Sequence, residues 1–190
     1  TPIDAALINQ LPNLKGIVTS GMRNAALDIN AAKSRGLMVS GTGSPGHATS
    51  ELAFTLIAMQ ARQIFASATA MRGGKWQTHL GRDLRGARLG ILGLGRLGTQ
   101  LAGYAKAFGM EIQAWSQNLT KERCDEVGVL YVDREAFFQS SDFISIHLKL
   151  SSRVHHLVGT EEIAMMKPDA YLVNTSRAPI IDMAALTNAL

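Results

Sequence analysis

Apolar residues in the second part of the chain fall in short runs separated by stretches with helical spacing. The runs lie at 88–93, 111–115, 129–132, 143–148 and 170–174. Runs of this length and composition are typical of strands that are covered on both faces. The stretches 96–109, 120–128, 134–140, 160–166 and 182–190 have the spacing of helices. Strands that alternate with helices in this way predict an α/β fold with a doubly wound parallel sheet.

The first part of the chain predicts a smaller α/β unit. Helical patterns at 4–10 and 28–35 alternate with short strand patterns at 15–19 and 37–39. So few strands cannot close a core alone, so we expect this to be part of a second domain. Glycine, serine and proline in the loop 41–46 mark the boundary. We therefore assign residues 1–46 to a partial domain and 47–190 to the doubly wound domain.

A long helix is expected over residues 48–71, ended by Gly73 and Gly74. Its apolar face is wide, which predicts burial on more than one side. Left uncovered, such a face would be a costly apolar patch, so we expect part of it to pack against another subunit in a homodimer.

A glycine turn joins the first strand of the larger domain to its helix. Gly93, Gly95 and Gly98 have the spacing Gly-x-Gly-x-x-Gly. The first glycine permits a tight turn, the second lets a pyrophosphate approach the backbone, and the third lets helix and strand pack closely. Free N–H groups at the helix N-terminus would bind the phosphates. The position between strand and helix favours a dinucleotide site over a purely structural turn.

In a doubly wound sheet, ligands bind beyond the C-terminal ends of the strands, here the loops 93–98, 115–118, 147–149 and 174–177. An Asp or Glu that binds both ribose hydroxyls of NAD is usual after the second strand, but Ser116 stands there. A small neutral residue removes repulsion against a 2′-phosphate, and Lys121 and Arg123 lie within reach in the sequence. These features favour NADP over NAD; alternatively, Ser116 serves NAD through weaker hydrogen bonds.

Arg177 follows the fifth apolar run, on the expected cofactor side of the sheet. A guanidinium offers a planar fork for a bidentate grip on a carboxylate. By position alone, a surface ion pair is an equally good interpretation.

Composition narrows the function classes. The 190-residue chain carries a net charge of +4, but no run of five Lys or Arg and few aromatic residues, so a nucleic-acid partner is not expected. No apolar run has the length of a membrane-spanning helix, so we expect no membrane association.

The single cysteine, Cys124, excludes an intrachain disulfide and fits a reducing, cytoplasmic setting. His155 and His156 would point to opposite faces of a strand, and no cluster has metal-ligand spacing, so no metal is expected.

Several stretches resemble the D-isomer-specific 2-hydroxyacid dehydrogenase family, which includes phosphoglycerate, glyoxylate and hydroxypyruvate reductases. They keep the order and spacing of the family along nearly the whole chain. The matching stretches are Ser20–Asn24 with Asp28–Lys33, Ser50–Leu52, Gly93–Gly98, Met166–Pro168 and Asn174–Arg177. The resemblance implies a Rossmann domain, a flavodoxin-like substrate domain, and hydride transfer between NAD(P)H and a small 2-oxo acid.

The resemblance also implies roles for individual residues. The cofactor would be bound by the glycine turn, by a residue beside the adenosine ribose and by loops along the nicotinamide half. These residues are Gly93, Gly95, Arg96, Leu97, Gly98, Ser116, His147, Thr175, Ser176 and Arg177. For His147, a structural role at the cofactor site is favoured over proton transfer.

For the substrate, the resemblance implies that Arg177 is the catalytic arginine, which binds the carboxylate and the carbonyl oxygen. The loop with Gly21, Met22 and Arg23 matches the carboxylate-binding backbone of the substrate domain. The Arg23 side chain is a further candidate for contact with an anionic substrate, although a surface role is equally compatible.

Two departures from the family pattern matter. Ala178 replaces the usual glycine after the catalytic arginine, which is a mild change if the backbone there is not left-handed. The general acid His and its partner Glu come after the arginine motif in the family, beyond residue 190, so we expect an internal fragment of a longer protein. Two alternatives remain: a dinucleotide-sensing binding module similar to corepressors, and a fragment that binds cofactor but is catalytically inert.

Overall fold

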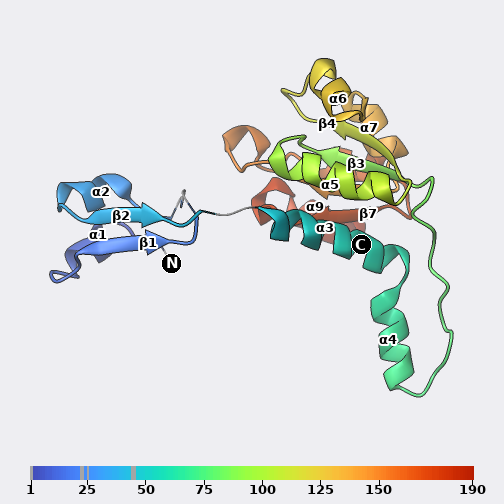
Figure 1. Ribbon diagram of the computed structural model, residues 1–190, viewed down its shortest axis with the longest axis horizontal. Coiled ribbons are helices and arrows are strands. Elements are labelled where there is room, and N and C mark those ends of the chain that lie inside the picture. Colours follow the sequence, from blue (N-terminus) through green and yellow to red (C-terminus); the bar gives the residue numbers. More distant parts are fainter. Residues whose placement is uncertain (1, 22–23, 25, 44–45) are drawn as a thin grey trace. The chain divides into compact units, whose positions relative to one another are not determined.

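The computed structural model describes residues 2–21, 24, 26–43 and 46–190. They belong to two compact units, 1–45 and 46–190, which are drawn in Figure 1 and considered separately below.

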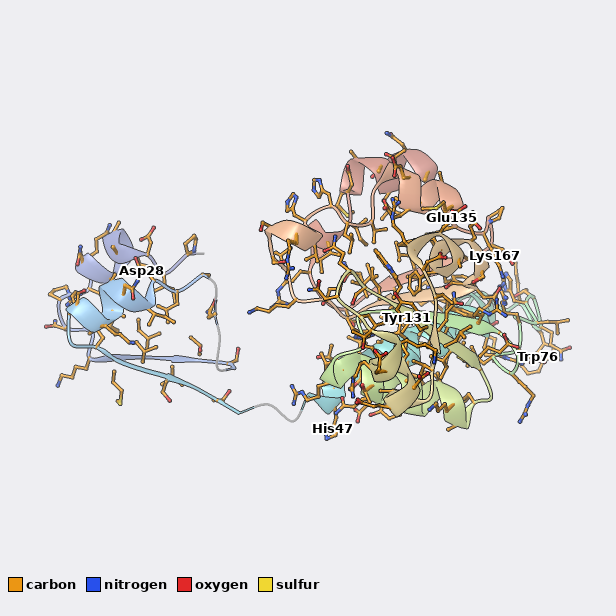
Figure 2. All side chains as sticks on the ribbon, turned by 90° about the horizontal axis from the view of Figure 1, so that it is seen from above. Asp28, His47, Trp76, Tyr131, Glu135 and Lys167 are labelled. Atoms are coloured by element: carbon orange, nitrogen blue, oxygen red, sulfur yellow. The ribbon has the colours of Figure 1, made fainter. Side chains whose placement is uncertain are left out.

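The smaller unit is a two-stranded parallel sheet with two short helices. Its elements are α1 (Ala5–Asn9), β1 (Gly16–Thr19), α2 (Ile29–Ser34) and β2 (Met38–Gly41). Asp28, labelled in Figure 2, begins α2 by accepting a hydrogen bond from the N–H of Ala31 at 2.9 Å. Among its described residues, the buried side chains that cluster together are Ile8, Ala32 and Leu37. A cluster of this size is small for a domain that folds alone.

The larger unit contains a five-stranded parallel sheet in the order β5-β4-β3-β6-β7. The strands are β3 (Arg88–Leu92), β4 (Glu111–Trp115), β5 (Leu130–Tyr131), β6 (Phe143–Ile146) and β7 (Tyr171–Asn174). The helices are α3 (His47–Ala61), α4 (Ile64–Arg72), α5 (Arg96–Ala107), α6 (Lys121–Val127), α7 (Arg134–Ser140), α8 (Thr160–Met165) and α9 (Met183–Ala189). Short 3₁₀ helices lie at η1 (Ser152–Val154) and η2 (Ala178–Ile180). The predicted doubly wound fold is confirmed, and each predicted strand ends within two residues of the observed one.

Helices cover both faces of this sheet, as Figure 1 shows. Leu89 and Ile91 of β3 pack into one core with Ile57 of α3. Leu92 of the same strand packs into a second core with Phe137 of α7. Side chains alternate along a strand, so β3 is buried on both faces from Leu89 to Leu92 and lies at the centre of a three-layer structure.

The strand order creates a switch point between β3 and β6. From β3 the chain runs outward to β4 and then β5, and it returns to add β6 and β7 on the other side of β3. Loops that leave β3 and β6 at their C-terminal ends therefore diverge, and the crevice between them is the position where doubly wound sheets bind ligands.

The prediction of one helix over 48–71 is wrong, because α3 ends at Ala61 and α4 begins at Ile64. Gln63 between them is left-handed, with φ 49° and ψ 39°. The Ala61 carbonyl accepts a hydrogen bond from the N–H of Arg82 at 2.7 Å, and Arg62 pairs with Asp83. The segment that follows α4 thus bonds to the C-terminal end of α3, where the next turn of that helix would otherwise form.

Within one copy of the chain, burial of this region is uneven. One row of α3 is buried, with Ala53 and Ile57 fully inaccessible, whereas Leu52 on the neighbouring row is 52% exposed. No described side chain of α4 is buried, and this helix projects from the sheet in Figure 1.

Among the described residues, no helix has the length and apolar character needed to span a membrane.

Candidate functional site

The glycine turn lies at the C-terminal end of the central strand. Gly93 follows β3 with φ 101°, and its N–H donates to the Trp115 carbonyl at 3.0 Å. A Cβ atom at Gly98 would lie 2.3 Å from the Gly93 carbonyl oxygen, which is too close for any side chain. Backbone of α5 therefore packs directly on the end of β3, and only glycine fits there.

The turn leaves the start of α5 open. Gly95 precedes α5, its side chain position meets no atom within 4 Å, and it provides no side-chain cap. The first N–H groups of a helix have no intrahelical partner and carry a partial positive charge. The geometry therefore fits an anionic group such as a pyrophosphate beside Gly95 and the half-buried Leu97.

The side chain of Arg96 extends toward the start of α3. A Cβ built on Gly46 would lie 2.7 Å from Nη2 of Arg96. The guanidinium is thus beside Gly46, and the backbone of Arg96 forms the start of α5.

Ser116 follows β4 and lines a cavity of about 150 Å³ with Gln117 and Asn118. The opposite wall comes from the loop after β6, including Lys149 and Arg153. The sequence rule for strand ends selected the loop 147–149, but nothing in the local pattern indicated that Arg153 from η1 would reach the same cavity.

Lys121 and Arg123, which the sequence put within reach of this region, have partners on and beside their own helix. Lys121 Nζ lies 2.6 Å from Asp125, and an Arg123 nitrogen lies 2.8 Å from Glu126. Arg123 also donates to the Thr99 hydroxyl at 3.1 Å. Neither residue lines the cavity beside Ser116.

Cys124, between these cations in the sequence, is a buried free cysteine that packs in the core. Burial raises the pKa of its thiol, and the nearby Lys121 and Arg123 lower it less. The thiol is therefore protonated at neutral pH and serves as an apolar packing residue.

His147 lies directly after β6 and adjoins the glycine turn. A Cβ on Gly93 would lie 3.0 Å from the His147 carbonyl oxygen, and Nε2 of His147 lies 2.9 Å from the Ser145 hydroxyl. Burial lowers the pKa of His147 to about 4. Its imidazole is neutral at pH 7, which suits a positioning role at the cofactor site better than donation of a proton.

The loop after β7 is held by Asn174. Its side-chain oxygen accepts from the Ser176 N–H at 2.9 Å, and its nitrogen donates to the Arg177 carbonyl at 3.0 Å. The Ser176 hydroxyl donates to the Leu148 carbonyl at 2.6 Å, which joins this loop to the one after β6. The loop is thus fixed at the switch-point edge of the sheet.

Two side chains of this loop are available for a ligand. Within the part of the chain that the structure describes, the buried Thr175 hydroxyl has no hydrogen-bond partner. A buried unpaired hydroxyl is costly, and a ligand with a polar group would satisfy it. Arg177 is exposed, and its guanidinium donates to the adjacent Ser176 carbonyl at 2.9 Å. Ala178 begins η2 without a positive φ, so the absence of glycine there causes no strain.

In the smaller unit, the predicted substrate loop begins at Gly21, which has φ 105°. Its N–H donates to the Thr42 hydroxyl at 3.1 Å, and its carbonyl accepts from the Thr19 hydroxyl at 2.8 Å. Met22 and Arg23 lie outside the described residues.

The expectation that His155 and His156 point apart is wrong. Their rings stack, with centroids 4.0 Å apart and an interplanar angle of 29°. His156 is left-handed, with φ 55°, so the pair does not have strand geometry. Over residues 2–21, 24, 26–43 and 46–190, no group of three or more His, Cys, Asp or Glu side chains could hold a metal ion.

Comparison with known proteins shows which of them this chain resembles in sequence and fold. Residues 54–190 match the family model described as D-isomer specific 2-hydroxyacid dehydrogenase, NAD binding domain. A glyoxylate reductase from Thermococcus litoralis is 39% identical over 99% of this chain and 60% of the relative. A hydroxypyruvate reductase from Thermotoga maritima is 36% identical over 98% of this chain and 61% of the relative. The crystal structure of a phosphoglycerate oxidoreductase from Vibrio cholerae superposes with a TM-score of 0.92 at 33% identity, covering 99% of this chain and 61% of the other. The chain thus spans about three fifths of the length of these relatives.

The glycine turn predicts opposite effects for two alanine substitutions in α5. Gly98→Ala forces a Cβ onto the Gly93 carbonyl and should lower the free energy of unfolding by about 1–3 kcal/mol. Gly103→Ala, at an exposed position of the same helix, meets no atom within 4 Å and should raise it by about 0.5–1 kcal/mol through helix propensity. Urea unfolding of both variants measures the difference, and equal stability would contradict the close approach.

The buried imidazole of His147 predicts a pH effect on stability. Its pKa is lowered in the folded state from 6.5 to about 4, so the unfolded chain binds more protons between these values. The free energy of unfolding should therefore fall as the pH is lowered from about 6.5 to about 4. Denaturant titrations across this window should show a shallower decline for His147→Gln than for the wild type. Parallel pH profiles for the two proteins would refute the assignment.

Proposed function

The chain belongs to the D-isomer specific 2-hydroxyacid dehydrogenase family, and from that premise we propose that the protein reduces a small 2-oxo acid to the D-2-hydroxy acid with NAD(P)H. Residues 47–190 form the cofactor domain in this proposal, and residues 1–46 form part of the substrate domain. The observation that carries it is the common location of the glycine turn, the unpaired Thr175 hydroxyl and Arg177 at the C-terminal edge of one sheet.

The residues present fit the two ends of a dinucleotide. Gly93, Gly95, Gly98 and the first N–H groups of α5 would bind the pyrophosphate. Thr175 and Ser176 would line the nicotinamide half, and His147 would support the wall behind it. When bound, the reduced nicotinamide supplies the hydride that adds to C2 of the substrate.

Arg177 is the residue of this chain that would act on the substrate. Its guanidinium would bind the carboxylate with one edge and polarise the carbonyl oxygen with the other, so that negative charge developing on that oxygen is stabilised. Asn174 fixes the backbone of Arg177 through its hydrogen bond to the carbonyl. The Gly21–Arg23 loop would supply further contacts to the carboxylate. The general acid His and its Glu partner are not assigned to any residue of 1–190.

The proposal includes a preference for NADP over NAD. Ser116 follows the second strand of the sheet without a carboxylate, so nothing there would repel a 2′-phosphate. A cytoplasmic location is part of the same proposal, because the single cysteine is buried and unpaired.

The proposal also includes a homodimer, formed through α4 and the segment after it. Phe65, Trp76 and Leu80 are 74%, 73% and 84% exposed, and Figure 2 shows Trp76 at the outer surface. Apolar exposure on this scale is typical of subunit interfaces. We commit to a second copy of this chain as the partner.

Steady-state kinetics test the reaction. The full-length protein should oxidise NADPH, and NADH more slowly, with at least one of glyoxylate, hydroxypyruvate and pyruvate. Arg177→Gln should lower kcat/KM by about 100-fold or more, since the charged fork is lost. Arg85→Gln, an exposed arginine before the other end of β3, should keep wild-type kinetics.

Inactivity of the wild type with a wide panel of 2-oxo acids, together with unchanged kinetics of Arg177→Gln, would overturn the proposed reaction. Peptide binding that depends on NADH in such a protein would support the corepressor-like alternative instead.

Sedimentation velocity tests the homodimer. The wild-type protein should sediment as a dimer, and Phe65→Glu should dissociate it, because the charge would be buried in the interface. Leu130→Glu is a matched control, since Leu130 is likewise an exposed apolar residue, at 59%, and lies on β5, an edge strand of the sheet. A monomeric wild type would rule the interface out.

A further inference from the structure

The cavity beside Ser116 has walls from two loops that are distant in sequence. Residues 116–118 follow β4, and residues 148–157 follow β6, so the cavity lies at the ligand-binding edge of the sheet. Its volume of about 150 Å³ suits one end of a dinucleotide, because sites for whole drug-sized ligands measure roughly 300–1,000 Å³.

The lining of this cavity is positive. Lys149 and Arg153 are its charged members, and no carboxylate is among the residues that line it. Within the described residues, neither cation forms an ion pair. Both charges are therefore available to an anion that enters the cavity.

Arg153 is held against the loop that carries Ser116. Nε2 of Gln117 donates to the Arg153 carbonyl at 3.4 Å, so the backbone of η1 is tied to the loop after β4. Val154 next to it is buried in the core. These two contacts hold the Arg153 backbone on the cavity wall and leave its side chain exposed.

We propose that Lys149 and Arg153 are the residues that select a 2′-phosphorylated dinucleotide, by neutralising the phosphomonoester that Ser116 hydrogen-bonds. This inference rests on the proposed function, because it assumes that the adenosine end of the cofactor occupies this cavity. A phosphomonoester carries about −1.5 to −2 charges and three acceptor oxygens, which two cations and one hydroxyl satisfy.

The selection comes from the loop after β6 and not from α6. Lys121 and Arg123 follow Ser116 more closely in sequence, but Asp125 and Glu126 pair with them. An arriving phosphate would have to compete with these carboxylates, whereas Lys149 and Arg153 line the cavity without such competitors.

Equilibrium binding to variants of the full-length protein tests the inference. Lys149→Gln and Arg153→Gln should each raise the Kd for NADPH by about tenfold, the loss of one charge-assisted hydrogen bond, and change the Kd for NADH by less than about twofold. Arg153→Glu should reverse the preference to NADH, because a carboxylate repels the phosphate. Lys121→Gln is the matched control, with the same change of charge on α6 and an unchanged Kd ratio. Both cations are exposed, so the variants should fold, and retained NADH binding reports this.

Fragments of the cofactor separate the possible results. 2′,5′-ADP should lose affinity in the same variants by the same factor as NADPH, whereas 5′-AMP should not. If NADPH affinity is unchanged in both single variants, or falls only in Lys121→Gln, the inference is overturned while the proposed dinucleotide site stands. If the wild type binds neither NADPH nor NADH, the proposed function fails and this inference with it.

Discussion

The contact between the backbones of β3 and α5 determines where every other part of the candidate site can lie. Gly98 is against the Gly93 carbonyl with no room for a Cβ atom, so the helix starts directly at the end of the strand. A longer turn would leave the N–H groups of α5 farther from the sheet edge. The close start instead directs them into the crevice between β3 and β6. Residues on other loops can then contribute to the candidate site if they lie close to this glycine turn.

The strand order determines which loops do so. Because β6 lies beside β3, the loop after β6 contacts the glycine turn, with the His147 carbonyl close to Gly93. Because β7 lies beside β6, the Ser176 hydroxyl can reach the Leu148 carbonyl at 2.6 Å. The close approach of His147 to Gly93 and the hydrogen bond from Ser176 to Leu148 thus link the glycine turn to the loop that contains Arg177. The Arg177 side chain is exposed, but its backbone carbonyl is hydrogen-bonded by Asn174.

Features set by local interactions could be predicted from the sequence, and features set by distant contacts could not. Asp182 accepts hydrogen bonds from the first turn of α9, a pattern that adjacent residues determine, so the start of this helix was predicted correctly. The break at Gln63 depends on Arg82 bonding to the Ala61 carbonyl, and no local signal marks it. Arg177 could be found because it follows a strand in a recognisable motif. Arg153 could not, because it reaches the cavity through an irregular segment whose path depends on packing of Val154 in the core.

The two ends of the candidate dinucleotide site are built by different physical means. At the pyrophosphate end, the donors are backbone N–H groups, and their position depends on Gly93 and Gly98, where a side chain does not fit. At the adenosine end, the charges are on exposed side chains at the rim of a small cavity, where substitution costs little folding energy. A change at the first end disrupts packing between β3 and α5, whereas a change at the second alters only the charge that meets the ligand. Under the proposed function, the preference between NAD and NADP can therefore change without altering the glycine turn.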